Sequence, residues 1–384
     1  MGATTTTVDK ILKEKYVGPI QEAMTQGRVL LEKMDRNSED YDGKKIVIPV
    51  NSARNAGLGG AAEDGTLPTA GSQAYVDATY TPEAVYGRGQ ISGHAMRHSK
   101  TDAGSFARAL DRELRNLERD FKNDCNRILN GNGDEILTRV NGTTGSQTAI
   151  TVDSTRFLNA GDTILIDTDS ATISSVDSDT TITISSAVTV ADNDAVKRRI
   201  GSTTVVEPDG IQNVIDDDNT FGTIDRTSAL YWQAKVLDNG GTLRDLGLDD
   251  MDQLTREVEK RTNEMPDNFY CKQELRDVYG ALLQADKRYN STTLSGGKKN
   301  LTHNDVPFLT DFHAADNTIF APKWSSFGLV EAGPVDFMDK DGSTLSRVVN
   351  KDAYEYTLVW EFQTVGYNPR ENASLTDLSE TVPA

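Results

Sequence analysis

Residues 65–93 read GTLPTAGSQAYVDATYTPEAVYGRGQISG, and residues 99–129 read SKTDAGSFARALDRELRNLERDFKNDCNRIL. The first stretch is rich in glycine and small polar residues, and it contains no lysine. The second stretch predicts one long amphipathic helix that begins near residues 99–102. The junction between an extended segment and a long helix is the strongest indication of the fold in this chain.

The predicted helix carries a single apolar stripe, and the rest of its surface is charged. Its apolar residues are spaced by four, four, three, four, four and three positions, which matches the helical period; they are Phe106, Leu110, Leu114, Leu117, Phe121, Cys125 and Ile128. At about 1.5 Å per residue the helix would be about 40 Å long, which is longer than an average globular helix. A helix of this length suits a flat, wide subunit.

The extended segment predicts a two-stranded ribbon with almost no core of its own, because small and polar residues alternate along it. A strand at residues 44–50, KKIVIPV, leads into it. Gly57, Gly59 and Ala62 match a dinucleotide-binding pattern, but Gly65 and Pro68 interrupt the helix that this pattern requires. Such a ribbon needs a neighbouring surface to cover it.

The length and the net charge of the chain restrict which classes of protein it can belong to. A chain of 384 residues can bury a sizeable core and usually holds two or three domains. The net charge of −19 argues against direct wrapping of nucleic acid, since binders concentrate Lys and Arg. Cys125 and Cys271 are too few for a disulfide framework, which favours synthesis in the cytoplasm. The chain shows neither a signal-peptide pattern at its start nor an apolar stretch of membrane-spanning length.

The regions around the long helix differ in character. Residues 1–45 predict a polar arm with a modest helix, whose apolar residues are Ile20, Met24, Leu30, Leu31 and Met34. Residues 141–204 are rich in Thr, Ser, Asp, Val and Ile, and they alternate short strands with turns. This region predicts a small all-β insertion.

From Ile211 the chain predicts a mixed α/β region. We expect helices at 228–237, 251–261 and 272–286, a strand at 268–271, and a loop at 290–300. Near the C-terminus one set of residues, Tyr354, Tyr356, Leu358, Trp360 and Phe362, alternates with a second set, Glu355, Thr357, Val359, Glu361 and Gln363. This alternation is the clearest strand pattern in the chain.

Residue patterns for catalysis or metal binding are weak. His94 and His98 have the spacing of a zinc site on a helix, but Gly93 makes a helix doubtful there and no third ligand is placed by sequence. His303 and His313 read as ordinary loop histidines. Aspartates at 216–218 and 339–342 do not complete a calcium loop, so turns are the better interpretation. The chain has no GxSxG motif. We expect no enzyme activity, no cofactor and no metal site.

Four strings resemble the major capsid proteins of tailed bacteriophages, which have the Hong Kong 97 shell fold that encapsulins share. They are LPTAGSQ (67–73), YGRGQISG (86–93), SKTDAGSFARAL (99–110) and FGTIDRTSALYWQ (221–233). The resemblance implies an α+β fold divided in order along the chain: an N-terminal arm (1–45), an extended loop (46–98), a peripheral domain with a spine helix (99–140), an all-β insertion domain (141–204), an axial domain (205–322), and C-terminal strands that return to the peripheral domain (323–384).

The resemblance also implies a function. It points to a subunit that assembles with itself as hexamers and pentamers into an icosahedral shell around double-stranded DNA, without sequence-specific binding. The implied partners are portal, scaffolding and possibly decoration proteins, with no membrane; the short arm favours a separate scaffolding protein or none. The location would be the virion capsid, assembled in the cytoplasm of a bacterial host. An acidic wall would not trap DNA sliding past it, and simple solubility explains the charge equally well.

Two alternatives stay open at this stage: an encapsulin-like compartment around an enzyme cargo, and a β-rich adhesin or binding module. If the capsid interpretation holds, the intersubunit contacts should lie between residues 57 and 99. The candidate residues are Leu67, Pro68, Tyr86, Arg88 and Arg97, with the two arginines as candidates for salt bridges to acidic neighbours.

One further expectation follows from the resemblance. Some shells of this fold weld their subunits through a lysine on the extended loop and an asparagine of a neighbour. This chain has no lysine between Lys45 and Lys100. We therefore predict a shell that is not cross-linked by that chemistry.

Overall fold

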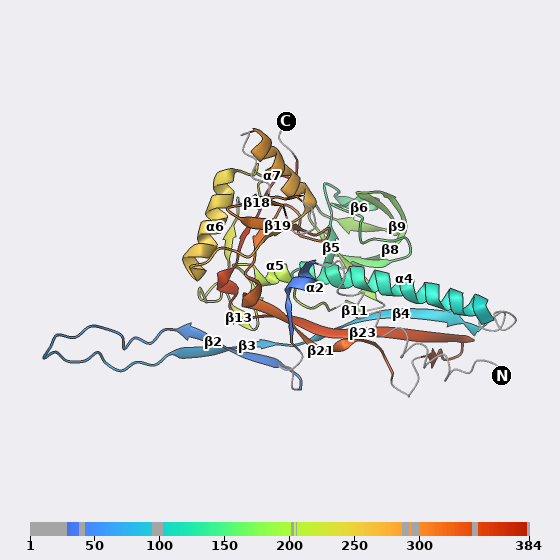
Figure 1. Ribbon diagram of the computed structural model, residues 1–384. Helices are drawn as coiled ribbons and strands as arrows, with labels where there is room; N and C mark the ends of the chain where they lie inside the picture. The colour runs from blue at the N-terminus through green and yellow to red at the C-terminus, as the bar shows by residue number, and fades with distance from the viewer. Residues whose placement is uncertain are drawn as a thin grey trace. The chain divides into compact units, whose positions relative to one another are not determined.

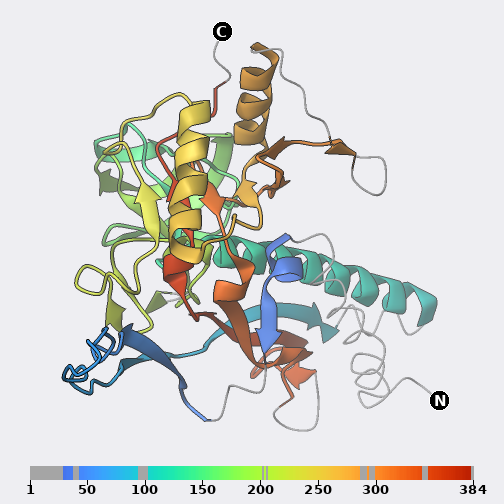
Figure 2. The same cartoon turned by 60° about the vertical axis from the view of Figure 1, so that its left-hand side comes forward.

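The computed structural model describes residues 29–37, 43–93, 103–200, 203–204, 206–285, 292–293, 299–339 and 345–381. The chain forms two compact units, and each is described by itself. The first unit combines residues 1–131 and 208–384, and the second comprises Asn132–Glu207. Figures 1 and 2 show the described elements from two directions.

The long helix of the first unit, α4 (Ala103–Asn130), confirms the predicted spine helix. Its side chains are described from residue 113 onward, and there the predicted stripe is buried, with Leu114, Phe121 and Cys125 each at most 3% exposed. The helix runs along β4, as Figure 1 shows. The 3.6-residue period therefore identified the face that packs against the body.

Beside α4 lies a five-stranded sheet in the order β1-β21-β23-β22, with β4 also paired to β23. Its strands are β1 (Asp35–Asn37), β4 (Glu83–Ser92), β21 (Phe327–Phe337), β22 (Ser346–Arg347) and β23 (Ala353–Gly366). Along β23 the even-numbered residues from Tyr356 to Phe362 are buried and the odd-numbered residues between them are half-buried. The period-two prediction is confirmed, because one face of this strand lines the core.

Strand β4 corrects the expectation that the extended loop runs to residue 98. It pairs with β23 along its whole length, from Glu83 opposite Phe362 to Ser92 opposite Ala353. A Cβ atom on Gly87 would lie 2.9 Å from the Phe121 ring, and one on Gly89 would overlap the Tyr356 ring. The glycines assigned to the predicted extended loop thus let a helix and an aromatic ring approach the sheet closely.

A second sheet has six strands in the order β14-β24-β20-β15-β19-β18, and it packs with two helices around its own apolar core. The strands are β14 (Lys235–Leu237), β15 (Phe269–Cys271), β18 (Thr302–His303), β19 (Val306–Thr310), β20 (Ile319–Ala321) and β24 (Ala373–Leu375), and the helices are α6 (Leu248–Thr262) and α7 (Gln273–Ala285). Both helices and β15 match the sequence prediction. The C-terminal segment was expected to return wholly beside α4, but β24 belongs to this second sheet instead.

The helix expected at residues 228–237 is wrong. The chain makes turns there, and Lys235–Leu237 forms β14, which pairs in parallel with β24. The indole of Trp232 is fully buried and donates a hydrogen bond to the Phe221 carbonyl at 3.0 Å. Pairing with a strand far along the chain overrides the local helical pattern here.

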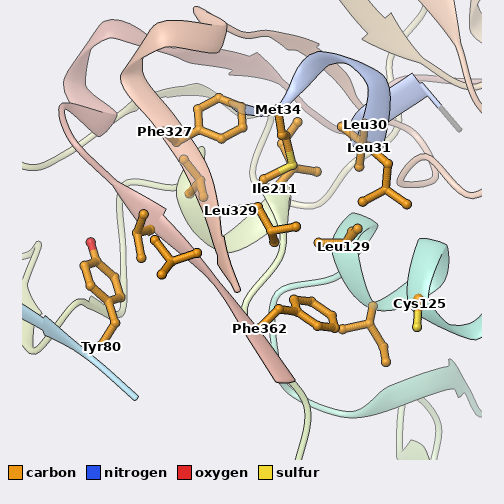
Figure 3. Close-up of a cluster of buried hydrophobic side chains, with 14 of the residues drawn as sticks. Leu30, Leu31, Met34, Tyr80, Cys125, Leu129, Ile211, Phe327, Leu329 and Phe362 are labelled. Atoms are coloured by element: carbon orange, nitrogen blue, oxygen red, sulfur yellow. The ribbon is translucent and has the colours of Figure 1, made fainter. Parts of the chain in front are cut away.

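The main core of the first unit joins the arm to the first sheet and α4. Leu30 and Leu31, in α2 (Val29–Lys33), and the following Met34 are buried as predicted, whereas Ile20 and Met24 lie outside the described residues. Figure 3 shows these side chains with Leu129, Ile211 and Phe362 in one cluster. The remaining short elements of this unit are α5 (Ile211–Val214), β12 (Thr220–Phe221), β13 (Ile224–Asp225), β16 (Thr292–Thr293), β17 (Lys299–Asn300), η2 (Trp324–Ser326) and η3 (Pro369–Glu371).

The described residues of the second unit form strands joined by turns and no helix, as the composition of residues 141–204 predicted, but its bounds, Asn132–Glu207, are wider. Its sheet has the order β11-β10-β7-β8-β9-β6, and β5 also pairs with β10. The strands are β5 (Ile136–Arg139), β6 (Gly145–Thr151), β7 (Thr163–Ile166), β8 (Asp169–Ser178), β9 (Thr181–Val190), β10 (Ala195–Ile200) and β11 (Thr203–Thr204). Because β5 belongs to this sheet, the unit begins before residue 141.

Candidate subunit-contact surface

The predicted ribbon consists of β2 (Ile46–Ala53) and β3 (Ala74–Tyr80), which pair with each other as a two-stranded antiparallel sheet. Ile46 lies opposite Tyr80 and Val50 lies opposite Val76, and the register shifts between Asn51 and Ala53. Residues 54–73 form the loop that joins the two strands. In Figure 1 the ribbon and its loop extend away from the two sheets and α4.

The two faces of the ribbon differ in exposure. On one face Ile46, Ala78 and Tyr80 are at most 3% exposed, so this face packs on the body. On the other face Val47 is 55% and Tyr75 is 62% exposed. Val47 lies opposite Thr79 and Tyr75 lies opposite Asn51, so the two side chains share the face that the body leaves exposed, at opposite ends of the paired strands. The sequence analysis missed both residues, although the alternation in KKIVIPV could have indicated Val47.

The loop at 54–73 exposes two leucines. Leu58 is 73% and Leu67 is 79% exposed, and Pro68 is half-buried. The Asn55 side chain accepts the Gly57 N–H at 2.7 Å, and a Cβ atom on Gly57 would lie 2.8 Å from the backbone nitrogen of Gly71. The two arms of the loop therefore run close together. This arrangement leaves the sequence-predicted Leu67 in solvent, where an apolar side chain gains nothing from its own subunit.

Tyr86 and Arg88 lie on a different element, β4, on the face opposite to Gly87 and α4. Tyr86 is 55% exposed. The Arg88 guanidinium donates to the Glu355 carboxylate of β23 at 2.6 Å within the same chain, and both side chains are partly in solvent. An exposed pair of this kind contributes little to stability. Arg97 lies outside the described residues. The candidate contacts thus fall on two separate elements, the ribbon loop and β4.

His303 corrects the expectation of an ordinary loop histidine. It is 8% exposed, with the Tyr279 hydroxyl 2.9 Å from Nδ1 and the Asp252 carboxylate 2.9 Å from Nε2. Burial lowers the pKa of His303, and the nearby Asp252 opposes that shift. The neutral imidazole can accept from Tyr279 and donate to Asp252, so the triplet satisfies its polar atoms and joins α6, α7 and β18. His313 is also buried, with 9% of its surface exposed.

Other chemistry is sparse in the described part of the chain. No group of three or more His, Cys, Asp or Glu side chains able to hold a metal ion occurs among the described residues. Cys125 and Cys271 are both fully buried, and they do not form a disulfide with each other. Burial raises the pKa of the Cys271 thiol to about 12, which keeps it protonated and unreactive. Of the helices that the structure describes, none is both long and apolar enough to cross a bilayer.

A long helix over one sheet, a two-stranded ribbon and a second sheet with two helices together make up the first unit. Compared by sequence, the chain matches no known protein family and no curated protein. Compared by structure, it is similar to the capsid of cyanophage A-1(L), with a TM-score of 0.55 and 12% identity over 91% of this chain and 93% of that one. The capsid of a native GTA particle gives a TM-score of 0.50 and 8% identity over 91% and 90% of the two chains. The holo-SrpI encapsulin of Synechococcus elongatus gives 0.48 and 12% identity over 93% and 89%. The chain has the Hong Kong 97 fold that the sequence resemblance predicted.

Proposed function

We propose that this protein is the major capsid protein of a tailed bacteriophage. Its copies would group as hexamers and pentamers and close into an icosahedral shell around double-stranded DNA. The single observation that carries the proposal is the match of nearly the whole chain to the cyanophage capsid subunit. In this proposal α4 and the first sheet form the peripheral domain, and the second sheet with α6 and α7 forms the axial domain around which subunits meet.

The exposed apolar residues support a subunit that is completed by its neighbours. Leu58, Leu67 and Tyr75 are each more than 60% exposed, and all three belong to the ribbon or its loop. A two-stranded ribbon is at best marginally stable by itself in water. Obligate assemblies typically bury more than about 2,000 Å² per interface, and the ribbon would contribute to such an interface by lying on an adjacent subunit.

The charge of the chain fits enclosure of DNA rather than binding of it. With a net charge of −19, the inner wall would repel phosphate and leave the packaged polymer mobile. We propose portal, scaffolding and decoration proteins as further partners, and assembly in the cytoplasm of the bacterial host. The insertion unit, Asn132–Glu207, would serve to steady neighbouring subunits.

The test is negative-stain electron microscopy of the purified protein after size-exclusion chromatography, with and without a scaffolding protein supplied. Closed shells or ring-shaped capsomers are the expected result. A monomer at every concentration, even with the scaffold supplied, would contradict the proposal. Nucleic acid inside the shells made during infection would separate a virus capsid from a compartment that encloses an enzyme.

A further inference from the structure

One side chain holds the root of the ribbon, which we define as residues 46–50 and 76–80. Tyr80 is 3% exposed, and its ring packs edge-on against Phe221 with 5.2 Å between the ring centroids. Its hydroxyl accepts the Gly366 N–H at 3.1 Å and lies 3.4 Å from the Gly366 carbonyl oxygen. The ribbon is therefore joined to β12 and to the end of β23 by a buried aromatic residue with both ring and hydroxyl engaged.

Phe221, Gly222 and Gly366 form the socket around Tyr80, and the two glycine positions have no room for a larger residue. Gly222 has a φ of +60°, and a Cβ atom there would lie 2.6 Å from the Tyr80 ring. A Cβ atom on Gly366 would lie 2.7 Å from the Phe221 ring. The backbone adds a further link, because Thr79 donates its N–H to the Gly222 carbonyl at 2.8 Å. The glycines allow the ring and the backbone to reach this turn together.

The wall of the socket is itself held in place. The Arg226 guanidinium lies 4.8 Å from the centroid of the Phe221 ring, and it donates to the carbonyl oxygens of Asp216, at 3.1 Å, and of Asn213. Arg226 is fully buried. Burial lowers its pKa to about 10, so it stays charged at neutral pH. A cation over a desolvated ring adds to the rigidity of Phe221.

Beyond the root the ribbon has no such support. From residue 51 to residue 75 every residue is exposed or half-buried, and at the outer end of the root the exposed fraction of Val76 is already 39%. The register of β2 and β3 shifts between Asn51 and Ala53, which places an irregularity at Ser52. A β-bulge disrupts the ladder and bends the strand locally. The buried contacts that hold the ribbon on the body and the regular pairing of β2 with β3 therefore end at the same place, next to Ser52.

We propose that Tyr80 latches the ribbon root to the body, and that the ribbon bends beyond the root, at the register shift around Ser52. In this proposal the root, residues 46–50 and 76–80, stays fixed on the body, and the part of the ribbon beyond Ser52 moves. The ribbon does not hinge where the chain leaves the body. The value of this arrangement for assembly rests on the proposed function: subunits in hexamers and pentamers meet at different angles, and a bend at Ser52 would let the loop follow them.

Hydrogen exchange of the purified, unassembled full-length subunit, read by mass spectrometry, tests the latch. We expect the paired amides of the root to exchange at least about tenfold more slowly than the paired amides beyond it, in the pairs Asn51–Tyr75 and Ala53–Ala74. Tyr80→Ala should accelerate exchange of the root by about tenfold or more, because both the ring contacts and the hydroxyl bonds are lost. Tyr75→Ala removes an exposed tyrosine from the same strand, and it should leave the root within about twofold of the natural protein.

Tyr80→Phe distinguishes loss of the latch from a general loss of folding, because it keeps the ring and removes only the hydroxyl. It should accelerate root exchange by a smaller factor while the amides of α4 stay unchanged. Uniform protection along the whole ribbon would overturn the bend at Ser52. Unchanged root exchange in both Tyr80 variants would overturn the latch. Because exchange is read on subunits and shells are read by microscopy, the latch and the capsid function can fail separately.

Discussion

The β unit Asn132–Glu207 and the ribbon of β2 and β3 are both built from strands with many small polar residues, yet only the first encloses a core of its own. Ile164 and Ile182 in the β unit are fully buried, and all fourteen buried residues of its core lie between Leu137 and Val196. In the ribbon loop, Leu58 and Leu67 are 73% and 79% exposed. The difference shows that the composition of the strands alone does not decide whether a segment folds around a core of its own.

The physical reason lies in how the strands are paired. In the β unit the order runs from β6 through β9, β8 and β7 to β10 and β5, and a bridge between Val140 and Val152 brings the end of β5 back to the end of β6. A sheet that curls back on itself buries one face of every strand. The ribbon has two strands, and its outer half has no second layer to bury either face.

Removal of the ribbon loop should produce the largest effect. Since Ala53 lies opposite Ala74, residues 54–73 can be replaced by Asn-Gly, which closes a two-residue hairpin. Shell formation should be lost, while the melting temperature of the subunit changes by less than about 2 °C, because the loop buries nothing on its own body. Microscopy and calorimetry check the two parts. Shells that form normally would mean that the loop is not an intersubunit contact.

A matched pair of truncations sharpens the same contrast. Ile182→Ala should lower the free energy of unfolding of the β unit by about 2–5 kcal/mol, because it leaves a cavity in a closed core. Leu67→Ala should change the stability of the subunit by less than about 0.5 kcal/mol and should weaken assembly instead. Calorimetry of unassembled subunits gives the first two values. Equal destabilisation by the two variants would contradict the distinction between the regions.

The absence of lysine from residues 46–99 makes a prediction about mature particles. Boiled in denaturant, they should run on a gel as a single band of the monomer, 41.9 kDa. Reduced and unreduced samples should look alike, since both cysteines are buried and not joined to each other by a disulfide. A ladder of covalent multimers would show that another residue of the ribbon or its neighbour forms a cross-link.

Thiol labelling gives the smallest and most local test. In the folded subunit Cys125 and Cys271 should not react with a thiol reagent at pH 8, because both are fully buried and the pKa of Cys271 is raised to about 12 by that burial. A cysteine introduced by Leu67→Cys should react at once. Denaturant should release two further thiols per chain. Rapid reaction of either natural cysteine would show that its core opens easily.

The parts of the fold that the sequence predicted are those with a strong local period. The stripe of α4 and the alternation of β23 each use side chains a few positions apart, so the pattern is readable within one element. Helices α6 and α7 follow the same rule. Of the candidate contacts, Leu67 and Tyr86 are exposed as an intersubunit role requires, whereas Arg88 already has an acidic partner in its own chain. Their contacts with a neighbour stay a prediction.

The failures share one cause, which is a partner far away in the chain. The glycines of β4 read as loop because the Phe121 and Tyr356 rings that need them cannot be seen from their neighbours. Residues 228–237 read as a helix because their pairing with Ala373–Leu375 is more than a hundred positions distant. His303 read as an ordinary loop histidine because Asp252 and Tyr279 come from two other elements.

The sequence by itself determined the helices α4, α6 and α7, the ribbon and the β unit, because backbone geometry and burial of one face impose their periods locally. It also determined the excess of acidic charge and the absence of lysine from the extended loop. Only the tertiary structure decided that β4 completes the first sheet, that β24 joins the second, and that Tyr80 closes a socket between Phe221, Gly222 and Gly366. Those choices depend on steric fit between residues far apart along the chain, and no local pattern records that fit.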